Sequence, residues 1–98
     1  MIMSNAVFSW SEEKNALLKA ERNICFEDIL MALQNGNLLE IIPNPSANHP
    51  EQKCLVVNIN DYAYLVPYVE SNEEIFLKTI YPSRKYSKLL RKGKTNEK

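Results

Sequence analysis

The sequence of 98 residues predicts a single α+β domain in which a helical half precedes a sheet. Apolar residues recur at helical spacing between residues 12 and 35. From residue 38 onward, short apolar segments alternate with turn-forming residues, as in antiparallel strands. The chain is short enough for one core only. We therefore expect an antiparallel sheet with the helices packed on one of its faces.

The first predicted helix covers residues 12–22 and follows a strand-like segment, FSW. Either Ser9 or Ser11 could cap it, and Ser9 has the capping-box spacing to Glu12. Acidic residues in the first turn suit the positive end of the helix dipole. The inward face of this helix is predicted to carry Ala16, Leu17 and Ala20.

A second predicted helix covers residues 26–35. Its apolar positions recur at intervals of three and four residues, and Gly36 stands where a left-handed cap would end it. The expected inward side chains are Phe26, Ile29, Leu30 and Leu33.

The second half of the chain reads as strands joined by turns. LLEII is a short strand, and the proline-rich segment 43–52 is a loop. KCLVVNI and YAYLVPYV form a hairpin around Asn60 and Asp61, which tolerate a left-handed backbone. Pro67 lacks an amide proton, so its strand is expected to be at an edge or bulged there.

The last predicted strand is IFLKTIY, residues 75–81. Simple alternation places Phe76, Lys78 and Ile80 on one side, where Lys78 interrupts an apolar row. Pro82 would begin a C-terminal helix. We expect residues 93–98 to be a frayed tail, and the inward side chains of the helix to be Tyr86, Leu89 and Leu90.

Charge is divided unevenly along the chain, although the net charge is zero. Residues 1–77 carry four Lys or Arg against eleven Asp or Glu, a balance of −7. Residues 78–98 carry eight Lys or Arg against one Glu, a balance of +7. This division predicts a basic C-terminal surface for a polyanion, while the acidic remainder opposes nonspecific adhesion to nucleic acid.

Several classes of protein are disfavoured by composition. Cys25 and Cys54 have no zinc-ligand or redox spacing and are expected to be small buried side chains. The N-terminus lacks the pattern of a signal peptide, and no window approaches a membrane span. A cytoplasmic protein without a metal or cofactor is therefore expected, with no membrane partner.

Three cations lie close together where the last strand meets the C-terminal helix. They are Lys78, Arg84 and Lys85, and the start of the helix adds backbone amides that suit a phosphate. Lys78 either reaches the sheet margin or lines a cleft. The strand tyrosines share a face that is either core or a base-stacking platform; they are Tyr62, Tyr64 and Tyr68.

His49 is the single histidine and lies in the proline-rich loop. It could act as a base near neutral pH, although most loop histidines have no such role. One histidine without clustered carboxylates or thiolates offers no metal site.

Two blocks of the sequence resemble BrnT-type toxins. The first is FSWSEEKNALLKAERNICFEDI, with a Phe-x-Trp-x-x-x-Lys opening and a later Phe-Glu-Asp; these residues are Phe8, Trp10, Lys14, Phe26, Glu27 and Asp28. The second is YAYLVPYVESNEEIFLKTIYPSRKYSK, similar to the Leu-Lys-Thr-Ile-x-Pro-Ser-Arg-Lys corner of one branch of that family. The resemblance covers roughly residues 8–92. Many relatives have Lys-His-Gly where this chain has Glu21, Arg22 and Asn23.

The resemblance implies a RelE-like fold and a metal-independent endoribonuclease that inhibits translation. It also implies a type II toxin-antitoxin system, in which a ribbon-helix-helix antitoxin neutralises the toxin and the pair binds operator DNA through the antitoxin. In such folds the sheet face and C-terminal basic residues hold RNA.

A mechanism without a catalytic histidine can be assigned to these residues. Arg84 is expected to stabilise the phosphorane formed when the RNA 2′-hydroxyl attacks phosphorus. Lys78 is the candidate base, provided that an apolar row desolvates it, and Tyr86 or Tyr81 is the candidate acid. Lys85 and Lys53 would hold phosphates, and further RNA contacts are expected from Lys88, His49 and Arg22. The alternative is a noncatalytic module whose basic corner binds an acidic segment of a partner protein.

Overall fold

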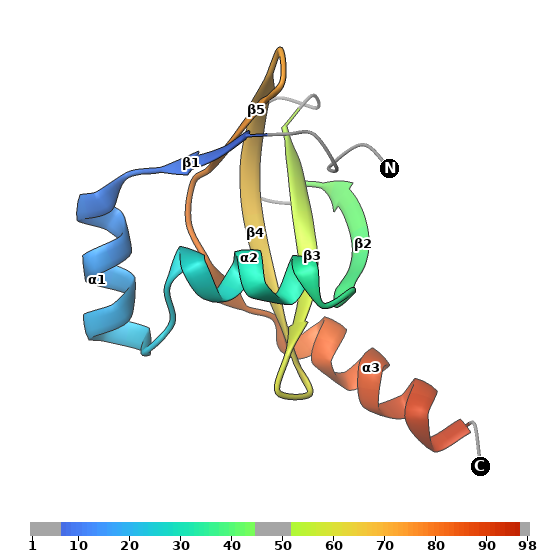
Figure 1. The fold of residues 1–98 in the computed structure, drawn as a ribbon. Coiled ribbons are helices and arrows are strands. Elements are labelled where there is room, and N and C mark those ends of the chain that lie inside the picture. Colours follow the sequence, from blue (N-terminus) through green and yellow to red (C-terminus); the bar gives the residue numbers. More distant parts are fainter. Residues whose placement is uncertain (1–6, 45–51, 97–98) are drawn as a thin grey trace.

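The computed structural model describes residues 7–44 and 52–96, which form a mixed sheet and three helices (Figure 1). The six strands described have the order β1-β5-β4-β3-β2, and β6 pairs with β4. The α+β prediction is thereby confirmed, but the sheet is not purely antiparallel as expected, because residues Val7–Trp10 pair in parallel with Glu74–Leu77. In chain order the elements are β1 (Val7–Trp10), α1 (Glu12–Arg22), α2 (Phe26–Gln34), β2 (Leu38–Pro43), β3 (Lys53–Ile59), β4 (Tyr62–Ser71), β5 (Glu74–Leu77), β6 (Tyr81–Pro82) and α3 (Arg84–Asn96).

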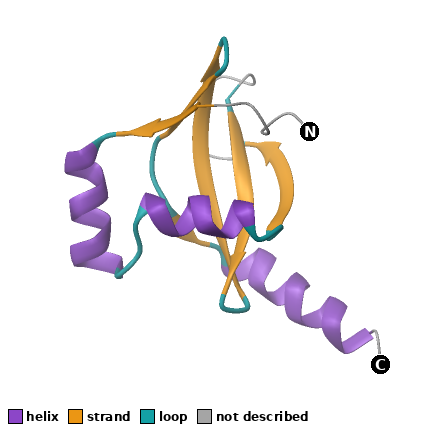
Figure 2. Ribbon diagram, viewed as in Figure 1, coloured by secondary structure: helices purple, strands orange, loops and turns teal. Residues whose placement is uncertain are grey.

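The two N-terminal helices bury side chains in one apolar cluster on one face of the sheet, as the sequence predicted, but α3 packs on the opposite face. We call the face covered by α2 the front face and the opposite face, on which α3 packs, the back face (Figures 1 and 2). A large apolar cluster, which includes Phe26, Leu55 and Val66, fills the space between α2 and the front face. A smaller cluster on the back face contains Cys54, Val56, Ala63 and Leu65, with Tyr86 of α3 packed against it. Two faces are therefore buried, and each has its own helix.

Helix α1 begins and ends where the sequence predicted, and Ser11, one of the two predicted caps, caps it, but its buried face differs. Ser11 is the N-cap, and its side chain accepts a hydrogen bond from the backbone amide of Lys14. Ser9 lies instead in β1, where its hydroxyl donates to the Glu74 carboxylate at 2.7 Å. The capping box between Ser9 and Glu12 is thus wrong, because Ser9 is engaged in the sheet.

The predicted inward face of α1 is exposed. Ala16, Leu17 and Ala20 all face solvent, and Leu17 is 50% exposed. The buried residues of the helix are Asn15 and Leu18, which lie on the opposite side of the helix. Helical spacing alone did not favour Asn15 as an inward residue, because its burial depends on polar partners that only the fold supplies.

Asn15 joins α1 to the start of α2. Its side-chain oxygen accepts a hydrogen bond from the buried backbone amide of Phe26 at 2.7 Å, and its side-chain nitrogen donates to Glu27 at 2.9 Å. The amide of Cys25 in turn donates to Asp28, which completes the cap of α2. Two otherwise unpaired amides at the beginning of α2 are satisfied in this way.

Helix α2 follows the prediction closely. Phe26 and Ile29 are buried, Leu30 and Leu33 are partly buried, and Ala32 joins them on the inward side. The ring of Phe26 stacks on that of Trp10 in β1, with 5.4 Å between centroids. Gly36 has the expected left-handed backbone, with a φ of 77°. Glycine suits this position because a side chain would strain the backbone there.

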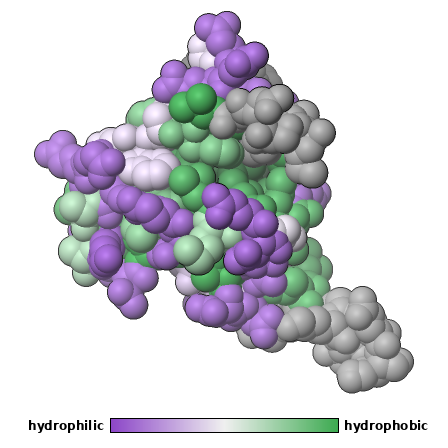
Figure 3. All heavy atoms as spheres, in the orientation of Figure 1, coloured by the Kyte–Doolittle hydropathy of each residue, from purple (hydrophilic) through white to green (hydrophobic). Residues whose placement is uncertain are grey.

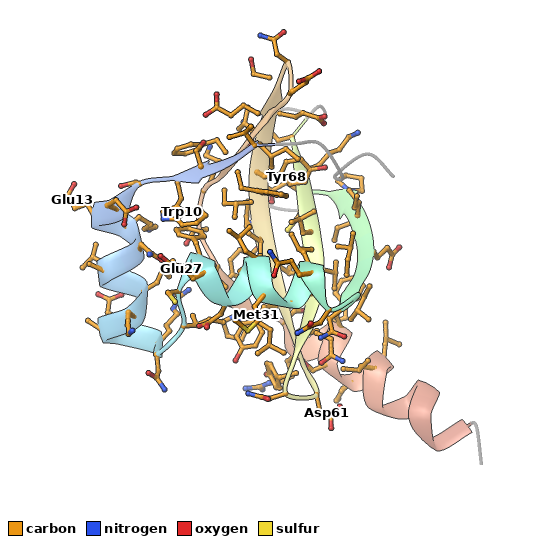
Figure 4. All side chains as sticks on the ribbon, viewed as in Figure 1. Trp10, Glu13, Glu27, Met31, Asp61 and Tyr68 are labelled. Carbon is orange, nitrogen blue, oxygen red and sulfur yellow. The ribbon has the colours of Figure 1, made fainter. Side chains whose placement is uncertain are left out.

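Strands β3 and β4 form the predicted hairpin. Both turn residues have positive φ values, 55° for Asn60 and 66° for Asp61, and Asp61 lies at the tip of the hairpin (Figure 4). These values match the turn that suits the twist of a two-residue hairpin. The register then pairs Ile59 with Tyr62 and Cys54 with Pro67.

Pro67 lies in the middle of β4, which is an inner strand of the sheet. Its local surroundings still fit a residue without an amide proton. Strand β5 pairs with residues 68–71 and β6 with residues 64 and 65, so Pro67 lies between these paired segments. Its carbonyl accepts from the Lys78 amide at 2.8 Å. The sequence predicted an edge or a bulge at Pro67. The structure has an irregularity at this position, although β4 as a whole is not an edge strand.

The predicted last strand is interrupted between β5 and β6. Val69 pairs with Phe76, and Leu65 pairs with Tyr81. Between these pairs β4 advances four residues while the opposite segment advances five, so one extra residue is accommodated within residues 78–80. This is a β-bulge, and it shifts the alternation of side chains beyond it by one residue.

The bulge corrects the predicted faces of the last strand. Phe76 is exposed and Lys78 faces solvent, but Ile80 is fully buried in the front cluster. Tyr81 packs against the back cluster instead. Simple alternation placed Lys78 and Ile80 on the same side of the strand. In the structure Ile80 lies on the opposite face, so Lys78 does not interrupt an apolar row.

Helix α3 begins two residues later than Pro82, which belongs to β6. Ser83 acts as its cap, since its hydroxyl accepts from the backbone amide of Tyr86. Ser87 is buried and accepts the Ala63 amide at 2.8 Å, which fastens the helix to β4. Leu89, predicted to face inward, is 53% exposed. The helix continues to Asn96, beyond the point where a frayed tail was predicted.

Candidate nucleic-acid interface

The back face next to the bulge carries exposed apolar and aromatic side chains. Val69 and Phe76 are a cross-strand pair, and they are 40% and 39% exposed. Lys78 comes two residues after Phe76 and lies opposite Pro67. Tyr81, half-buried, is paired with Leu65 and follows on the same face. A cation is therefore flanked by two aromatic rings along one line of the sheet.

Helix α3 continues this surface with further cations. A shallow hollow of about 490 Å³ is lined by Arg84, Lys85, Lys88 and Leu89. The three charged side chains are exposed. The first turn of a helix also leaves backbone amides without partners in the helix, which adds to the attraction for an anion.

The side chain of Tyr86, a residue of α3, lies between this helix and the sheet. Its ring is half-buried against the back cluster, and the Lys85 ammonium lies 5.7 Å from the ring centroid. A cation over a ring at this distance is favourable, and it holds Lys85 near the sheet. We call the surface formed by these side chains the basic surface; its members are Phe76, Lys78, Tyr81, Arg84, Lys85, Tyr86 and Lys88.

The structure does not bring Lys78 and Arg84 to one point. Lys78 lies opposite Pro67, and Ser83, the neighbour of Arg84, donates to Ala63. These two positions are four residues apart on β4, so the backbones are separated by about 13 Å. The two cations are too far apart to act on a single phosphorus centre and suit contacts to separate phosphates of a strand.

The structure does not favour Lys78 as the base that the sequence suggested. That role required desolvation by an apolar row, and Lys78 is exposed. An exposed lysine beside aromatic rings fits a phosphate contact instead. Among the described residues of the basic surface, the groups that can move a proton near the cations are the hydroxyls of Tyr81 and Tyr86.

Two of the three strand tyrosines, Tyr64 and Tyr68, belong to the core rather than to a stacking platform. Tyr68 is 1% exposed, and Tyr64 packs against the same front cluster. Tyr62 meets Tyr64 edge to face, with 5.6 Å between centroids. Burial raises the pKa of the Tyr68 hydroxyl above its ordinary value of 10.0. Figure 4 shows Tyr68 on the sheet above α2, and its side chain belongs to the front cluster.

Lys53 is not part of the basic surface. Lys53 pairs with Tyr68, and both line a separate hollow of about 480 Å³ near the β4–β5 turn. His49 lies outside the described residues, so its predicted role has no structural counterpart here. Lys53 is too far along the sheet to join Arg84, because β4 runs from Tyr68 to Ala63 between them.

Arg22 forms a hydrogen bond with the backbone of the bulge. Although it is exposed at the end of α1, its guanidinium donates a hydrogen bond to the Ile80 carbonyl, 58 residues later in the chain. Arg22 was predicted to contact RNA. Its observed partner is instead a backbone group beside Tyr81.

The cysteines and carboxylates offer no alternative centre. Cys54 is fully buried, and burial raises the pKa of its thiol to about 11. Burial also raises the pKa of the Cys25 thiol, which is partly exposed. Within residues 7–44 and 52–96 there is no cluster of three or more His, Cys, Asp or Glu that could hold a metal ion.

The outward sides of α1 and α2 are unlike the basic surface. Figure 3 shows hydrophilic side chains over both helices, with hydrophobic side chains of the sheet around α2. Five of these residues are acidic and exposed, namely Glu12, Glu13, Glu21, Glu27 and Asp28. A hydrogen bond from Asn15 lowers the pKa of Glu27. A polyanion would therefore approach from the back rather than from this side.

The sequence predicted the cations of the site. It did not predict that Val69 and Phe76 are exposed beside them, or that Arg22 binds the backbone of the bulge. Phe76 was assigned to one side of the predicted strand without regard to exposure. A signal for the bulge was present in the proline of β4, because Pro67 cannot pair with the opposite backbone carbonyl.

None of the helices in the described part of the chain combines the length and apolar character that a bilayer span requires.

Comparisons with known proteins do not assign the chain to a family. No protein-family model, no curated protein and no solved structure matches the sequence or the fold.

Proposed function

We propose that this protein is an RNA-cleaving toxin of a type II toxin-antitoxin pair, with a RelE-like fold, and that single-stranded RNA lies across the basic surface. The observation that carries the proposal is the line of Phe76, Lys78 and Tyr81 on the back face, continued by the cations of α3. Aromatic rings alternating with cations suit a single strand, because bases stack on the rings while phosphates meet the charges.

The resemblance to BrnT-type toxins is a second argument for the same function. Its second block, LKTIYPSRK, spans the bulge, β6 and the start of α3. The sequence block that prompted the resemblance and the surface suited to RNA therefore coincide in one segment of the chain.

The proposed reaction is transesterification within the RNA. The 2′-hydroxyl attacks the adjacent phosphorus, the bond to the 5′-oxygen of the next nucleotide breaks, and a cyclic phosphate remains. Arg84 stabilises the charged phosphorane, and Tyr86 donates a proton to the departing oxygen. One well-placed donor is worth about 3 kcal/mol in such a step. The proton of the 2′-hydroxyl passes to solvent, because no desolvated base adjoins Arg84 among the described residues.

Cleavage of a labelled single-stranded RNA by the purified chain, freed of any partner and kept in EDTA, tests the proposal. We expect cleavage by the wild type and a loss of about 100-fold or more in the rate for Arg84→Ala. An RNA with 2′-deoxyribose at the cleavage position should stay intact, because the attacking hydroxyl is missing. Lys19→Ala, an exposed cation on α1, is the matched control and should cleave normally.

Binding can be separated from cleavage by its salt dependence. Each phosphate contact on a single strand contributes about −0.7 to the slope of log K against log salt. Lys78→Ala should therefore flatten the slope by about 0.7, whereas Lys19→Ala should leave it unchanged. A well-folded wild type that neither binds nor cleaves RNA would reject the proposal.

The alternative function is a noncatalytic module whose basic surface binds an acidic segment of a partner protein. It would be favoured if RNA stays intact while an acidic peptide binds with a similar salt dependence. In the toxin proposal the partner is a ribbon-helix-helix antitoxin, through which the pair binds operator DNA. Co-expression with the product of a neighbouring short open reading frame should then suppress RNA cleavage.

A further inference from the structure

We propose that Arg22 is a positioning residue that fixes the register of β6 against β4 and thereby sets the arrangement of the basic surface. This inference deepens the proposed function and rests on it, because the surface that Arg22 arranges is the one assigned to RNA. The carrying observation is that the Arg22 guanidinium donates to the carbonyl of Ile80, a residue of the bulge.

The bulge leaves backbone groups that the sheet does not use. Strand pairing ends at Leu77 on one side of it and resumes at Tyr81 on the other, so residues 78–80 belong to no paired strand. The Lys78 amide is satisfied by Pro67. Pro67 has no amide with which to return a hydrogen bond, and the Ile80 carbonyl accepts one from Arg22. A buried or half-buried carbonyl without a donor is costly, so this contact favours the bulged arrangement.

The competing arrangement is a strand without the extra residue. Continuing the pairing of Val69 with Phe76 along β4 would bring Ile80, rather than Tyr81, opposite Leu65. Such a slip of one residue would exchange the faces of all side chains beyond it. Tyr81 would leave the back face, and the line of aromatic rings and cations would be broken.

Arg22 reaches the bulge from a well-anchored position. It is the last residue of α1, a helix held by the buried Asn15 and Leu18. Asn23 follows with a left-handed backbone, and its amide bonds to Lys19, which ends the helix at that point. The guanidinium is therefore offered from a rigid element, and its planar fork of donors suits a carbonyl that must be held in place.

The experiment measures the register of β6 directly by nuclear magnetic resonance. In the wild type, cross-strand proximity is expected between the backbones of Leu65 and Tyr81. Arg22→Met removes every donor but keeps a long apolar stem, and we expect it to weaken this proximity and to populate the slipped pairing of Leu65 with Ile80. Arg22→Lys keeps a donor and should largely restore the original register. Lys19→Ala, one turn earlier on α1, should have no effect on it.

Binding of single-stranded RNA adds a second readout. Arg22→Met should weaken binding about tenfold or more, the order expected when one stacked ring is misplaced. If Arg22 only contacted a phosphate, the same variant would flatten the salt slope by about 0.7 and leave the pairing of Leu65 with Tyr81 intact. That result would overturn the inference.

The two proposals fail in different ways. A wild type that does not bind RNA rejects the proposed function, while the register of Arg22→Met still decides the role of Arg22. Should Arg22→Met fail to fold, the wild type itself decides: hindered rotation of the Arg22 guanidinium, seen as separate signals of its two terminal nitrogens, supports the inference. Free rotation would overturn it.

Discussion

Replacing Asn15 with alanine should destabilise the protein by breaking the junction of α1 and α2. Asn15 is buried and accepts a hydrogen bond from the buried amide of Phe26. An amide left without a partner in such a place costs about 1–3 kcal/mol. The second hydrogen bond of Asn15, to Glu27, adds little because Glu27 is exposed. For a domain of this size, the expected fall in melting temperature is on the order of 10 °C.

Urea unfolding followed by tryptophan fluorescence measures this loss. The one tryptophan, Trp10 (Figure 4), stacks on Phe26, whose amide Asn15 holds, so its emission reports on the junction itself. Asn15→Asp keeps an acceptor for Phe26 but meets Glu27 with a like charge, and its loss should be intermediate. Asn35→Ala, at the exposed end of α2, is the control and should change the free energy of unfolding by less than about 0.5 kcal/mol.

The dependence on pH has a defined sign. Asn15 holds the pKa of the Glu27 carboxyl below its ordinary value of 4.5, so this contribution to stability is present above that pH and is lost as the pH falls. The difference between the wild type and Asn15→Ala should therefore shrink in acid. If Asn15→Ala were no less stable than Asn35→Ala at neutral pH, the assignment of Asn15 as the junction would be refuted.

Two further predictions concern the back face. Ser87→Ala should cost about 1–3 kcal/mol in urea unfolding, because it leaves the buried Ala63 amide without its acceptor, whereas the exposed Ser71→Ala should cost almost nothing. A thiol reagent at pH 8 should modify Cys25 first, and Cys54 only as fast as the protein opens, because Cys54 is buried with a pKa of about 11. Since that pKa lies above the ordinary 9.0, Cys54 stabilises the fold fully below pH 9 and loses this effect as the pH rises towards 11; rapid modification of Cys54 in the folded state would contradict its burial.

Part of the candidate site could be predicted from sequence because charge is a property of composition. The cations Lys78, Arg84 and Lys85 were found in this way, and all three are exposed. Their mutual distances could not be predicted, because these depend on how far apart Pro67 and Ala63 lie on β4. The same holds for the tyrosines. The sequence gives their number and positions along the chain, but the pairing of strands decides which of them face the core.

The sequence by itself determined the elements whose causes are local. The bounds of α1, the left-handed Gly36 and the turn at Asn60 and Asp61 follow from caps and backbone preferences within a few residues. For α1 and for the segment beyond the bulge, only the tertiary structure decided which face is buried. Ile80 is buried at the front and Tyr81 packs at the back because one extra residue in the bulge reverses an alternation of period two, and Arg22, far away in the sequence, occupies the carbonyl that the bulge leaves free.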